Sequence, residues 1–392
     1  MSEKPKRVLF VATVVKMHIM TFHIPCLKMF KEMGYETVVA ARNDYDNPED
    51  CQIPYCDKFY DIPFQREPFR YENYKCYKKL KSIIDEGDFS IVYCHTPVGG
   101  VLGRLAARDA AKKGTRVVYM AHGLHFYKGA PIQNWLLYYP VEKLCSRFAD
   151  LFITINKEDF ELAKKKMKSK CVEYLPGVGI DPDKFNSEKS EKESIRRELG
   201  ISEQDLVMVS VGEVNYNKNH GVAIEALSLC ETKNIHYLIV GQGDFKEQRL
   251  SKARLCNVED RVHFLGFRND VYKILKASDI FVFPSYREGL SVALTEAMAC
   301  ALPVVATKIR GNIDLIDEER GGLLCKPTDA KTMAKHIDTL AKNPELRHEM
   351  GLYNYEKSKK YDKNVIIHRL MAMILGQTKE NRVDVAKEKI VL

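Results

Sequence analysis

The chain has 392 residues, of which 45% are hydrophobic and 29% are charged, and its formal net charge is +8. This length favours two domains over one, and the modest positive charge does not call for a nucleic-acid partner. The eleven cysteines include no C-x2-C pair, so the sequence predicts neither a zinc framework nor a disulfide network.

The sequence also bears on location. No stretch approaches about twenty consecutive apolar residues, which argues against a transmembrane helix. Residues 1–7 lead directly into an apolar run instead of a secretory signal. Unpaired cysteines suit a reducing compartment. We therefore expect a cytoplasmic protein, peripheral to the inner face of a membrane at most.

The first half of the chain alternates apolar runs with helical patterns. Because parallel strands carry their connecting loops at the carboxyl edge of the sheet, ligands are expected at that edge. Residues 13–21 are predicted to be such a loop. The expected strands are 8–12, 36–40, 90–94, 116–120, 150–155 and 172–175, and the expected helices are 22–33, 71–84, 98–113, 134–148 and 157–168.

Histidines follow three of these strands, and His95, after 90–94, is given no role. His18 and His23 lie in and beside the first loop, where packing or solvent contact is as good an interpretation as ligand contact. His122 ends the strand 116–120, and the glycine after it favours a fixed position at the sheet edge. Asp44 to Asp46 spell a D-x-D metal motif, but their polar, proline-containing surroundings favour a turn.

The second half restarts the alternation after a hinge rich in glycine and proline at residues 176–182. The pattern predicts a second doubly wound α/β unit, followed by a loosely held tail at 378–392. Strands are expected at 206–211, 236–240, 261–265, 279–283 and within 301–307, and helices at 187–199, 220–230, 244–255, 271–277, 291–300, 329–340, 344–350 and 361–375.

Residues 285–298 carry the most informative pattern, because they join a buried strand to a helix through a glycine turn. Gly289, Leu290 and Ser291 are predicted at the helix N-terminus, where backbone N–H groups and the helix dipole suit a phosphate. Glu288 precedes the turn, and Glu296 lies about one and a half turns into the helix. Carboxylates accept hydrogen bonds from hydroxyl groups, so the stretch predicts a sugar-nucleotide site.

This stretch resembles the Glu-x7-Glu signature of the retaining glycosyltransferases of family 4. Seven residues separate Glu288 from Glu296, F-P-S precedes the motif, and A-L-P-V-V-A-T follows it. A second match is H-G-L-H-F-Y-K-G, residues 122–129, which resembles an element of family members that build bacterial surface polysaccharides. The resemblance implies the GT-B fold, with two Rossmann-like domains facing a central cleft. It places the N-terminal domain at 1–182, the C-terminal domain at 183–360, and a helix of about 361–376 returning to the first domain.

The resemblance also assigns site residues. Lys218 matches the family lysine on the donor diphosphate, whereas Glu213 stands where an arginine is common. His122 matches the histidine near the donor sugar, Glu288 would hold sugar hydroxyls and Glu296 ribose hydroxyls. The remaining expected contacts are Gly212, Gly266, Gly289, Leu290 and Ser291 on the donor, and His18, His23, His125 and Lys128 on the acceptor side.

The implied reaction is a retaining transfer of a hexose or N-acetylhexosamine from a nucleotide sugar, with UDP the expected nucleotide. The acceptor would be a glycan or a polyprenyl-diphosphate-linked glycan, and no metal or other cofactor is expected. Contact with an anionic membrane surface is an option, because residues 164–168 are lysine-rich. Two alternatives stay open: a sugar-nucleotide 2-epimerase of the same architecture and a non-catalytic nucleotide-sugar-binding subunit.

Overall fold

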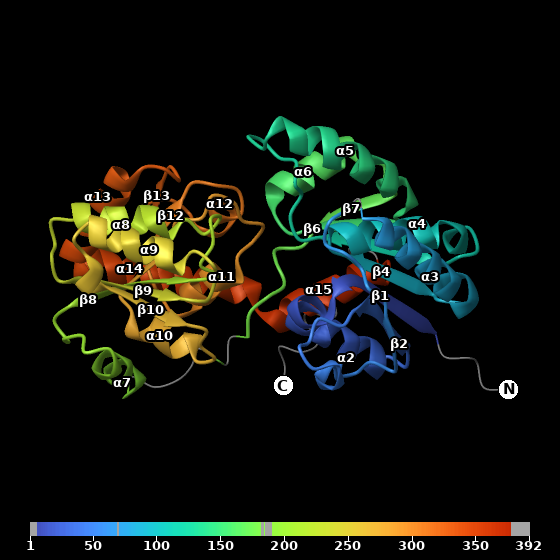
Figure 1. The fold of residues 1–392 in the computed structure, drawn as a ribbon, viewed down its shortest axis with the longest axis horizontal. Coiled ribbons are helices and arrows are strands. Elements are labelled where there is room, and N and C mark those ends of the chain that lie inside the picture. The colour runs from blue at the N-terminus through green and yellow to red at the C-terminus, as the bar shows by residue number, and fades with distance from the viewer. Residues whose placement is uncertain (1–5, 69, 182–183, 185–189, 378–392) are drawn as a thin grey trace. The chain divides into compact units, whose positions relative to one another are not determined.

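A computed structural model describes residues 6–68, 70–181, 184 and 190–377 (Figure 1). The chain divides into two compact units, Met1–Val178 with Ile366–Leu392, and Gly179–Val365. The expected tail at 378–392 and the start of the helix expected at 187–199 lie outside the described residues. None of the described helices combines the length and apolarity needed to cross a membrane.

The first unit is built on a seven-stranded parallel sheet in the order β3-β2-β1-β4-β5-β6-β7. Successive residues of β1 and β4, such as Val8 and Leu9, are fully buried, as expected where helices cover both faces of a sheet. The strands are β1 (Arg7–Val14), β2 (Glu36–Arg42), β3 (Lys58–Asp61), β4 (Ile91–His95), β5 (Arg116–Ala121), β6 (Leu151–Thr154) and β7 (Cys171–Tyr174).

Helices cover both faces of this sheet (Figure 1). Apolar residues of α3 (Tyr71–Gly87) and α4 (Pro97–Ala111) join the core on one face. On the other, Cys26 of α2 (Ile24–Glu32) lies 3.5 Å from Met371 of α15 (Lys363–Ile374), measured between the sulfur atoms. The remaining helices are α1 (Met20–Phe22), α5 (Ile132–Cys145) and α6 (Lys157–Lys166).

The prediction of a loop at residues 13–21 is wrong. Strand β1 continues to Val14, and Val15–Ile19 then form one turn of π-helix before α1 begins. The Asp44 carboxylate accepts hydrogen bonds from the backbone N–H groups of Lys16 and Met17 at 2.6 and 3.3 Å. A carboxylate therefore satisfies the first N–H groups of the turn, a long-range partner that local sequence patterns do not reveal.

The second unit has a six-stranded parallel sheet in the order β10-β9-β8-β11-β12-β13. The predicted strands of this half are confirmed to within one or two residues, but the short strand β13 at the sheet edge was not predicted. The strands are β8 (Leu206–Val211), β9 (Ile235–Val240), β10 (Val262–Gly266), β11 (Ile280–Phe283), β12 (Val304–Thr307) and β13 (Gly322–Cys325).

Two apolar layers enclose this sheet. One contains residues of α8 (His220–Leu229), α9 (Lys246–Leu255) and α13 (Ala330–Lys342). The other contains residues of α7 (Ser190–Glu198), α10 (Val271–Ala277) and α11 (Val292–Ala299). The short helix α12 (Asn312–Leu315) was not predicted, and α14 (Pro344–Ser358) continues well past the predicted end at residue 350.

A buried ion pair joins α4 to α5 in the first unit. Arg104 is fully buried, and its Nη2 donates to Glu142 Oε1 at 3.0 Å. Its Nε donates to the carbonyl oxygen of Gly100 at 2.7 Å, and its guanidinium lies 3.7 Å from the ring centroid of Tyr119. Burial is the largest single influence and lowers the pKa of Arg104, but the attraction and hydrogen bond of Glu142, together with Tyr119 and Cys145, outweigh it, so the pKa is raised.

We expect Arg104→Met to lower the free energy of unfolding by about 3–5 kcal/mol, because it leaves the Glu142 carboxylate buried without its partner. The double variant Arg104→Met/Glu142→Leu removes both charges and should regain most of that loss. Urea denaturation followed by far-UV circular dichroism measures both. A loss below about 1 kcal/mol in the single variant would show that the pair is not a stabilising feature of this unit.

Candidate functional site

The strand order of the second unit fixes where a ligand can bind. Strand β8 lies between β9 and β11, and the chain moves outwards from it in both directions. In open α/β sheets the crevice at such a reversal, at the carboxyl ends of the strands, receives the ligand. Residues 212–219 follow β8 and residues 284–291 follow β11, so both loops border this position.

Glycines bring each of these two loops unusually close to the backbone of its neighbours along the same sheet edge. The Gly212 N–H donates to the carbonyl oxygen of Val240 at 2.9 Å, and the Gly241 N–H donates to the carbonyl oxygen of Gly266 at 2.8 Å. A Cβ atom on Gly241 would lie 2.0 Å from the carbonyl oxygen of Gly212. On the far side, a Cβ atom on Gly311 would lie 2.2 Å from the carbonyl oxygen of Gly289. The predicted residues Gly212, Gly266 and Gly289 therefore all lie in tightly apposed turns at this edge.

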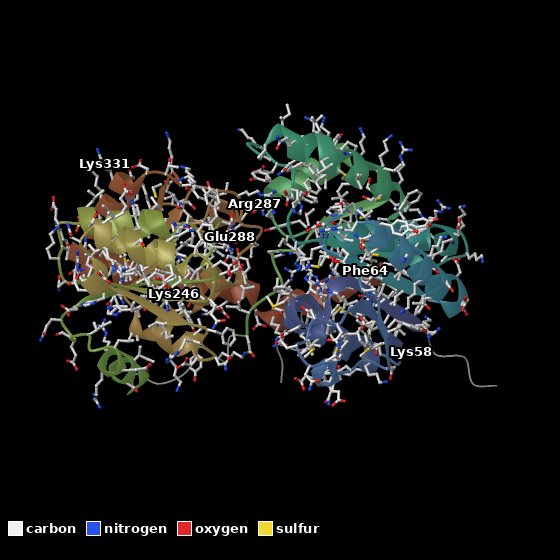
Figure 2. All side chains as sticks on the ribbon, viewed as in Figure 1. Lys58, Phe64, Lys246, Arg287, Glu288 and Lys331 are labelled. Carbon is white, nitrogen blue, oxygen red and sulfur yellow. The ribbon has the colours of Figure 1, made fainter. Side chains whose placement is uncertain are left out.

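Lys218 and Glu288 form an ion pair between the two loops. The Lys218 Nζ lies 2.8 Å from Glu288 Oε1, and both side chains keep less than a fifth of their surface exposed. The ammonium group also lies 4.8 Å from the ring centroid of Phe283. Glu288 is labelled in Figure 2. A positive charge and a hydrogen-bond acceptor are thus held together at the reversal of strand order.

The two loops are fastened to each other beside this pair. Asn217 donates from its side chain to the carbonyl oxygen of Arg287 at 2.9 Å and accepts at its backbone oxygen from the Tyr286 N–H at 2.8 Å. Asn219 adopts a left-handed conformation with φ of 51° and donates to the carbonyl oxygens of Pro284 and Pro327. The distance between Lys218 and Glu288 is therefore fixed by backbone contacts as well as by charge.

Helix α11 begins at the glycine turn, as predicted. Ser291 is its N-cap, and its hydroxyl accepts from the Leu294 N–H at 3.3 Å. The first N–H groups of a helix have no partner within the helix and favour an anion. Leu290 and Ser291 directly follow Glu288 and Gly289 in the chain. They therefore lie where a phosphate oxygen is best received.

The surroundings of Glu296 differ from those of Glu288, because burial dominates them instead of a close positive charge. Burial raises the pKa of Glu296 to about 7, and the positive charge of Lys184 opposes part of the rise. Its carboxyl group is therefore close to half-protonated at neutral pH. Either form accepts hydrogen bonds from hydroxyl groups.

Glu213 stands at a position where arginine is common, but its carboxylate is negative and does not suit an anion. It is exposed, and its carboxylate accepts from the Asn215 side-chain amide at 2.9 Å. Lys218 is therefore the cation of the loop 212–219 that can face an anion.

In the first unit, three of the five predicted histidine and lysine positions come together. His18, His23 and His122 lie around one point with His95, the residue that ends β4. His95 was given no role from the sequence, although it follows a strand as His122 does, and that signal identifies it.

His125 and Lys128 lie apart from this group. The His125 ring packs against the ring of Tyr138 in a tilted arrangement, with the centroids 4.7 Å apart. Lys128 is exposed, and its backbone N–H donates to the Glu158 carboxylate at 2.8 Å.

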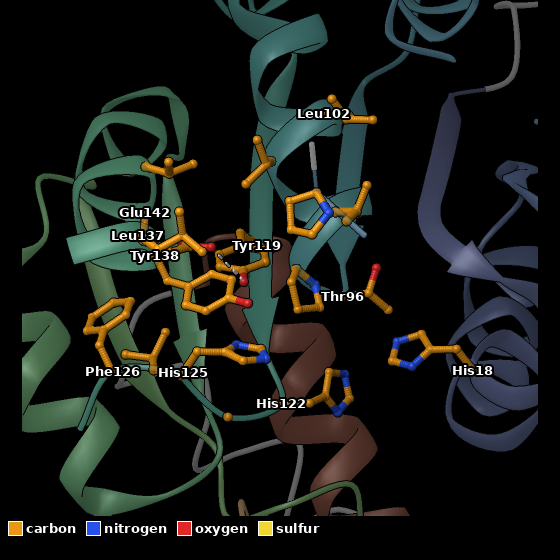
Figure 3. A pocket seen from close by; sticks show the side chains of 17 residues that line it. His18, Thr96, Leu102, Tyr119, His122, His125, Phe126, Leu137, Tyr138 and Glu142 are labelled. Atoms are coloured by element: carbon orange, nitrogen blue, oxygen red, sulfur yellow. Dashed lines mark hydrogen bonds between the residues drawn. The ribbon is translucent and has the colours of Figure 1, made fainter. Parts of the chain in front are cut away.

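A cavity of about 430 Å³ borders the histidine group. Its walls are mainly apolar and include Leu102, Phe126 and Leu137, and His18 and His122 lie at the same end of it (Figure 3). The first unit therefore offers an apolar chamber with imidazole groups at one end, large enough for part of a small-molecule ligand.

Comparison with known proteins places this architecture in a family. Residues 7–156 match the family model described as glycosyl transferase 4-like, and residues 191–357 match glycosyl transferases group 1. The putative glycosyltransferase EpsD of Bacillus subtilis is 39% identical over 350 residues, which cover 88% of this chain and 90% of that protein. The UDP-Gal:alpha-D-GlcNAc-diphosphoundecaprenol alpha-1,3-galactosyltransferase of Escherichia coli is 30% identical over 270 residues, or 66% of this chain and 69% of that protein.

Solved structures share the fold. HepE of Anabaena, in complex with UDP and glucose, superposes with a TM-score of 0.79 at 20% identity over 95% of this chain and 100% of that chain. WaaG, a glycosyltransferase involved in lipopolysaccharide biosynthesis, gives 0.73 at 19% identity over 94% of this chain and 100% of that chain. The chain belongs to the family 4 glycosyltransferases, and its two Rossmann-like units are those of the GT-B fold. It is a glycosyltransferase, as the Glu-x7-Glu resemblance predicted.

The raised pKa of Glu296 predicts a pH-dependent stability. The folded-state pKa of about 7 exceeds the ordinary value of 4.5, so the folded state binds the proton more tightly than the unfolded state does. The free energy of unfolding should therefore fall as pH rises from about 4.5 to 7, by roughly 1.4 kcal/mol per pKa unit. Glu296→Gln lacks this penalty and should gain stability over the wild type by about 2–3 kcal/mol at pH 8.

Urea denaturation at pH 5 and pH 8 measures the difference between Glu296→Gln and the wild type. Glu213→Gln, which removes an exposed carboxyl group from the same unit, is the matched control. If the gain of Glu296→Gln were the same at both pH values, the carboxyl group would not be held protonated by burial.

Proposed function

We propose that this glycosyltransferase moves a hexose or an N-acetylhexosamine from a UDP-sugar to a hydroxyl group of a glycan, with retention of the anomeric configuration. The observation that carries the proposal is the Lys218–Glu288 pair at the strand-order reversal of the second unit. Donor binding is assigned to residues 183–360, and acceptor binding to residues 1–182 with the helix at about 361–376.

Lys218 stabilises the leaving diphosphate in this proposal. Without a donor its ammonium group is neutralised by Glu288. A diphosphate that reaches the crevice offers the lysine a second and stronger anionic partner, and the N-terminus of α11 receives another phosphate oxygen. These positive groups lie where charge develops on the leaving group, so the transfer step itself is proposed to need no metal ion.

The carboxylates hold hydroxyl groups. Once Lys218 turns to the diphosphate, Glu288 can accept hydrogen bonds from the donor sugar, while Glu296, about one and a half turns along α11, accepts from the ribose. Gly266 is proposed to present its backbone to the nucleobase. His122 is proposed to donate a hydrogen bond to the donor sugar, and His18, His23, His125 and Lys128 to serve the acceptor.

The acceptor is proposed to be a glycan, either free or linked to a polyprenyl diphosphate. Support comes from the relatives: the Escherichia coli protein is named for a diphosphoundecaprenol-linked acceptor, and a Campylobacter jejuni N-acetylgalactosaminyltransferase, 28% identical over 235 residues, is named for another. The apolar cavity beside His18 and His122 is compatible with such an acceptor. We propose surface polysaccharide biosynthesis as the pathway class.

A lipid-linked acceptor would bring the protein to a membrane surface, and two helices of the first unit suit that contact. On α5, Trp135 packs inwards against Phe126, whereas Ile132 and Leu136 are about three-quarters exposed. The last turn of α6 carries three lysines, residues 164–166. Exposed apolar side chains near basic residues favour an anionic lipid surface.

We expect Lys218→Ala and Glu288→Gln each to lower the transfer rate by about 100- to 1,000-fold, since each removes a charge or an acceptor aimed at the reacting groups. Lys331→Ala, which removes an exposed lysine of the same unit that Figure 2 labels, is the control and should keep wild-type activity. The assay follows UDP release and glycan extension with candidate UDP-sugars and polyprenyl-diphosphate-linked acceptors, and proton NMR of the product reports the anomeric configuration. Near-normal rates in both site variants would rule out the assigned site.

The same assay separates the alternatives. Formation of an epimer from UDP-N-acetylglucosamine without any acceptor would favour a 2-epimerase. Binding of UDP-sugars without turnover by the wild type, across the acceptors tested, would favour a non-catalytic subunit.

The membrane proposal has its own test. The double variant Ile132→Ser/Leu136→Ser should reduce co-sedimentation with phosphatidylglycerol vesicles severalfold, because it removes two large apolar side chains from the proposed contact with lipid. Leu255→Ser, which alters a side chain of the second unit that is 82% exposed, is the matched control and should bind as the wild type does. Equal sedimentation of all three proteins would exclude α5 as the contact.

A further inference from the structure

Four histidines of the first unit converge from four places in the chain. His18 lies in the π-helical turn, His23 between α1 and α2, His95 at the end of β4, and His122 directly after β5. Each offers one ring nitrogen, and these four nitrogens lie within 4.8 Å of one another. Strands β1, β4 and β5 are neighbours in the sheet, so their carboxyl ends bring the rings together.

The spacing suits a single ion. Tetrahedral coordination with metal–nitrogen distances of about 2.0–2.1 Å separates the ligand nitrogens by roughly 3.3 Å. The Nε2 atoms of His18 and His23 are already 3.2 Å apart. All four nitrogens lie within 4.8 Å of one another, so even the widest pair needs to close by no more than about 1.5 Å.

Several of the nitrogens lack another partner. Neither ring nitrogen of His95 has a hydrogen bond, although the residue is fully buried, and the Nε2 of His122 is also buried without one. An unsatisfied buried polar atom costs about 1–3 kcal/mol, and a shared ion would take up one nitrogen of His95 and one of His122.

The four rings are available as ligands. Burial lowers the pKa of all four, and the mutual repulsion of their protonated forms lowers it further for His18, His23 and His95. Neutral imidazoles present a lone pair, which is the form that binds a metal. The surrounding side chains include Phe10 and Tyr93, whose ring centroids lie 6.3 and 4.0 Å from that of His95.

The ligand set selects the kind of ion. Four imidazole nitrogens suit zinc and its first-row neighbours cobalt, nickel and copper, whereas magnesium and calcium prefer oxygen. His18 and His122 also line the cavity, so one side of the site faces the chamber (Figure 3).

We propose that His18, His23, His95 and His122 form a binding site for one divalent late transition-metal ion, for which Zn²⁺ is the natural occupant to test. The ion fastens the segment after β1 to the ends of β4 and β5. It lies in the first unit and is separate from the diphosphate chemistry assigned to Lys218 in the second. A metal on one nitrogen of His122 leaves the other protonated, so this ring keeps a hydrogen bond to donate. His18 and His23 then serve the acceptor side by holding the ion and not by touching the acceptor.

The test uses the full-length chain without a histidine tag. After dialysis against a chelator, the protein is titrated with Co²⁺ and with Zn²⁺, and bound metal is counted by mass spectrometry. We expect one ion per chain, the intense visible absorption of tetrahedral Co²⁺, and a higher melting temperature with Zn²⁺. His95→Phe and, at the edge of the cavity, His122→Gln should each weaken binding by about 100-fold or more.

The control is His236→Gln/His263→Gln, which removes a histidine pair of the second unit whose ring nitrogens are 3.0 Å apart. It should bind Co²⁺ as the wild type does. The proposal is overturned if the wild type retains no ion, if the control loses the ion, or if His122→Gln, folded by circular dichroism, binds as tightly as the wild type. A His95→Phe variant that fails to fold leaves the decision to His122→Gln.

Discussion

The position at which each sheet reverses its strand order is the constraint on which this molecule depends. In the first unit the reversal lies between β1 and β4, and in the second between β8 and β11. At such a point the loops of two adjacent strands diverge to opposite faces and leave a crevice between them. The histidine group lies at the first reversal and the Lys218–Glu288 pair at the second. Side chains from segments far apart in sequence meet in both places because parallel strands end at the same edge.

The polar groups at the two reversals are stabilised in different ways. In the second unit, opposite charges neutralise each other at 2.8 Å, and glycine turns allow the backbones to approach closely. In the first unit, burial keeps the imidazoles uncharged. An anionic donor suits the former arrangement, because it can replace Glu288 as the partner of Lys218. A cation suits the latter, because neutral nitrogen lone pairs have no charge to displace.

Sequence patterns revealed the parts of the fold that depend on local residues. Buried strands such as β8 are continuous apolar runs, and the turn at Gly289 precedes a helix whose N-cap, Ser291, is a residue that favours that position. Strand β3 reads Lys-Phe-Tyr-Asp and was missed, because an edge strand of four residues has no apolar run to mark it. The π-helical turn was missed for another reason: its amides depend on Asp44, about 27 residues away.

The candidate site shows the same division. The motif spacing predicted Glu288 and Glu296, and the family resemblance added Lys218, but the ion pair between Lys218 and Glu288 depends on loops that meet only in the folded sheet. The raised pKa of Glu296 is likewise a consequence of burial. Burial cannot be predicted from the spacing of the two glutamates.

His95 marks the limit of such reasoning most clearly. Its sequence context, a histidine after an apolar strand, is the same as that of His122, yet only the strand order β1-β4-β5 makes the two neighbours. A strand order of β4-β1-β5 would place β1 between them and separate their rings by two strand spacings, about 9–10 Å. The convergence of the four rings therefore follows from sheet topology, and any ligand they share is selected by the fold as a whole rather than by a local motif.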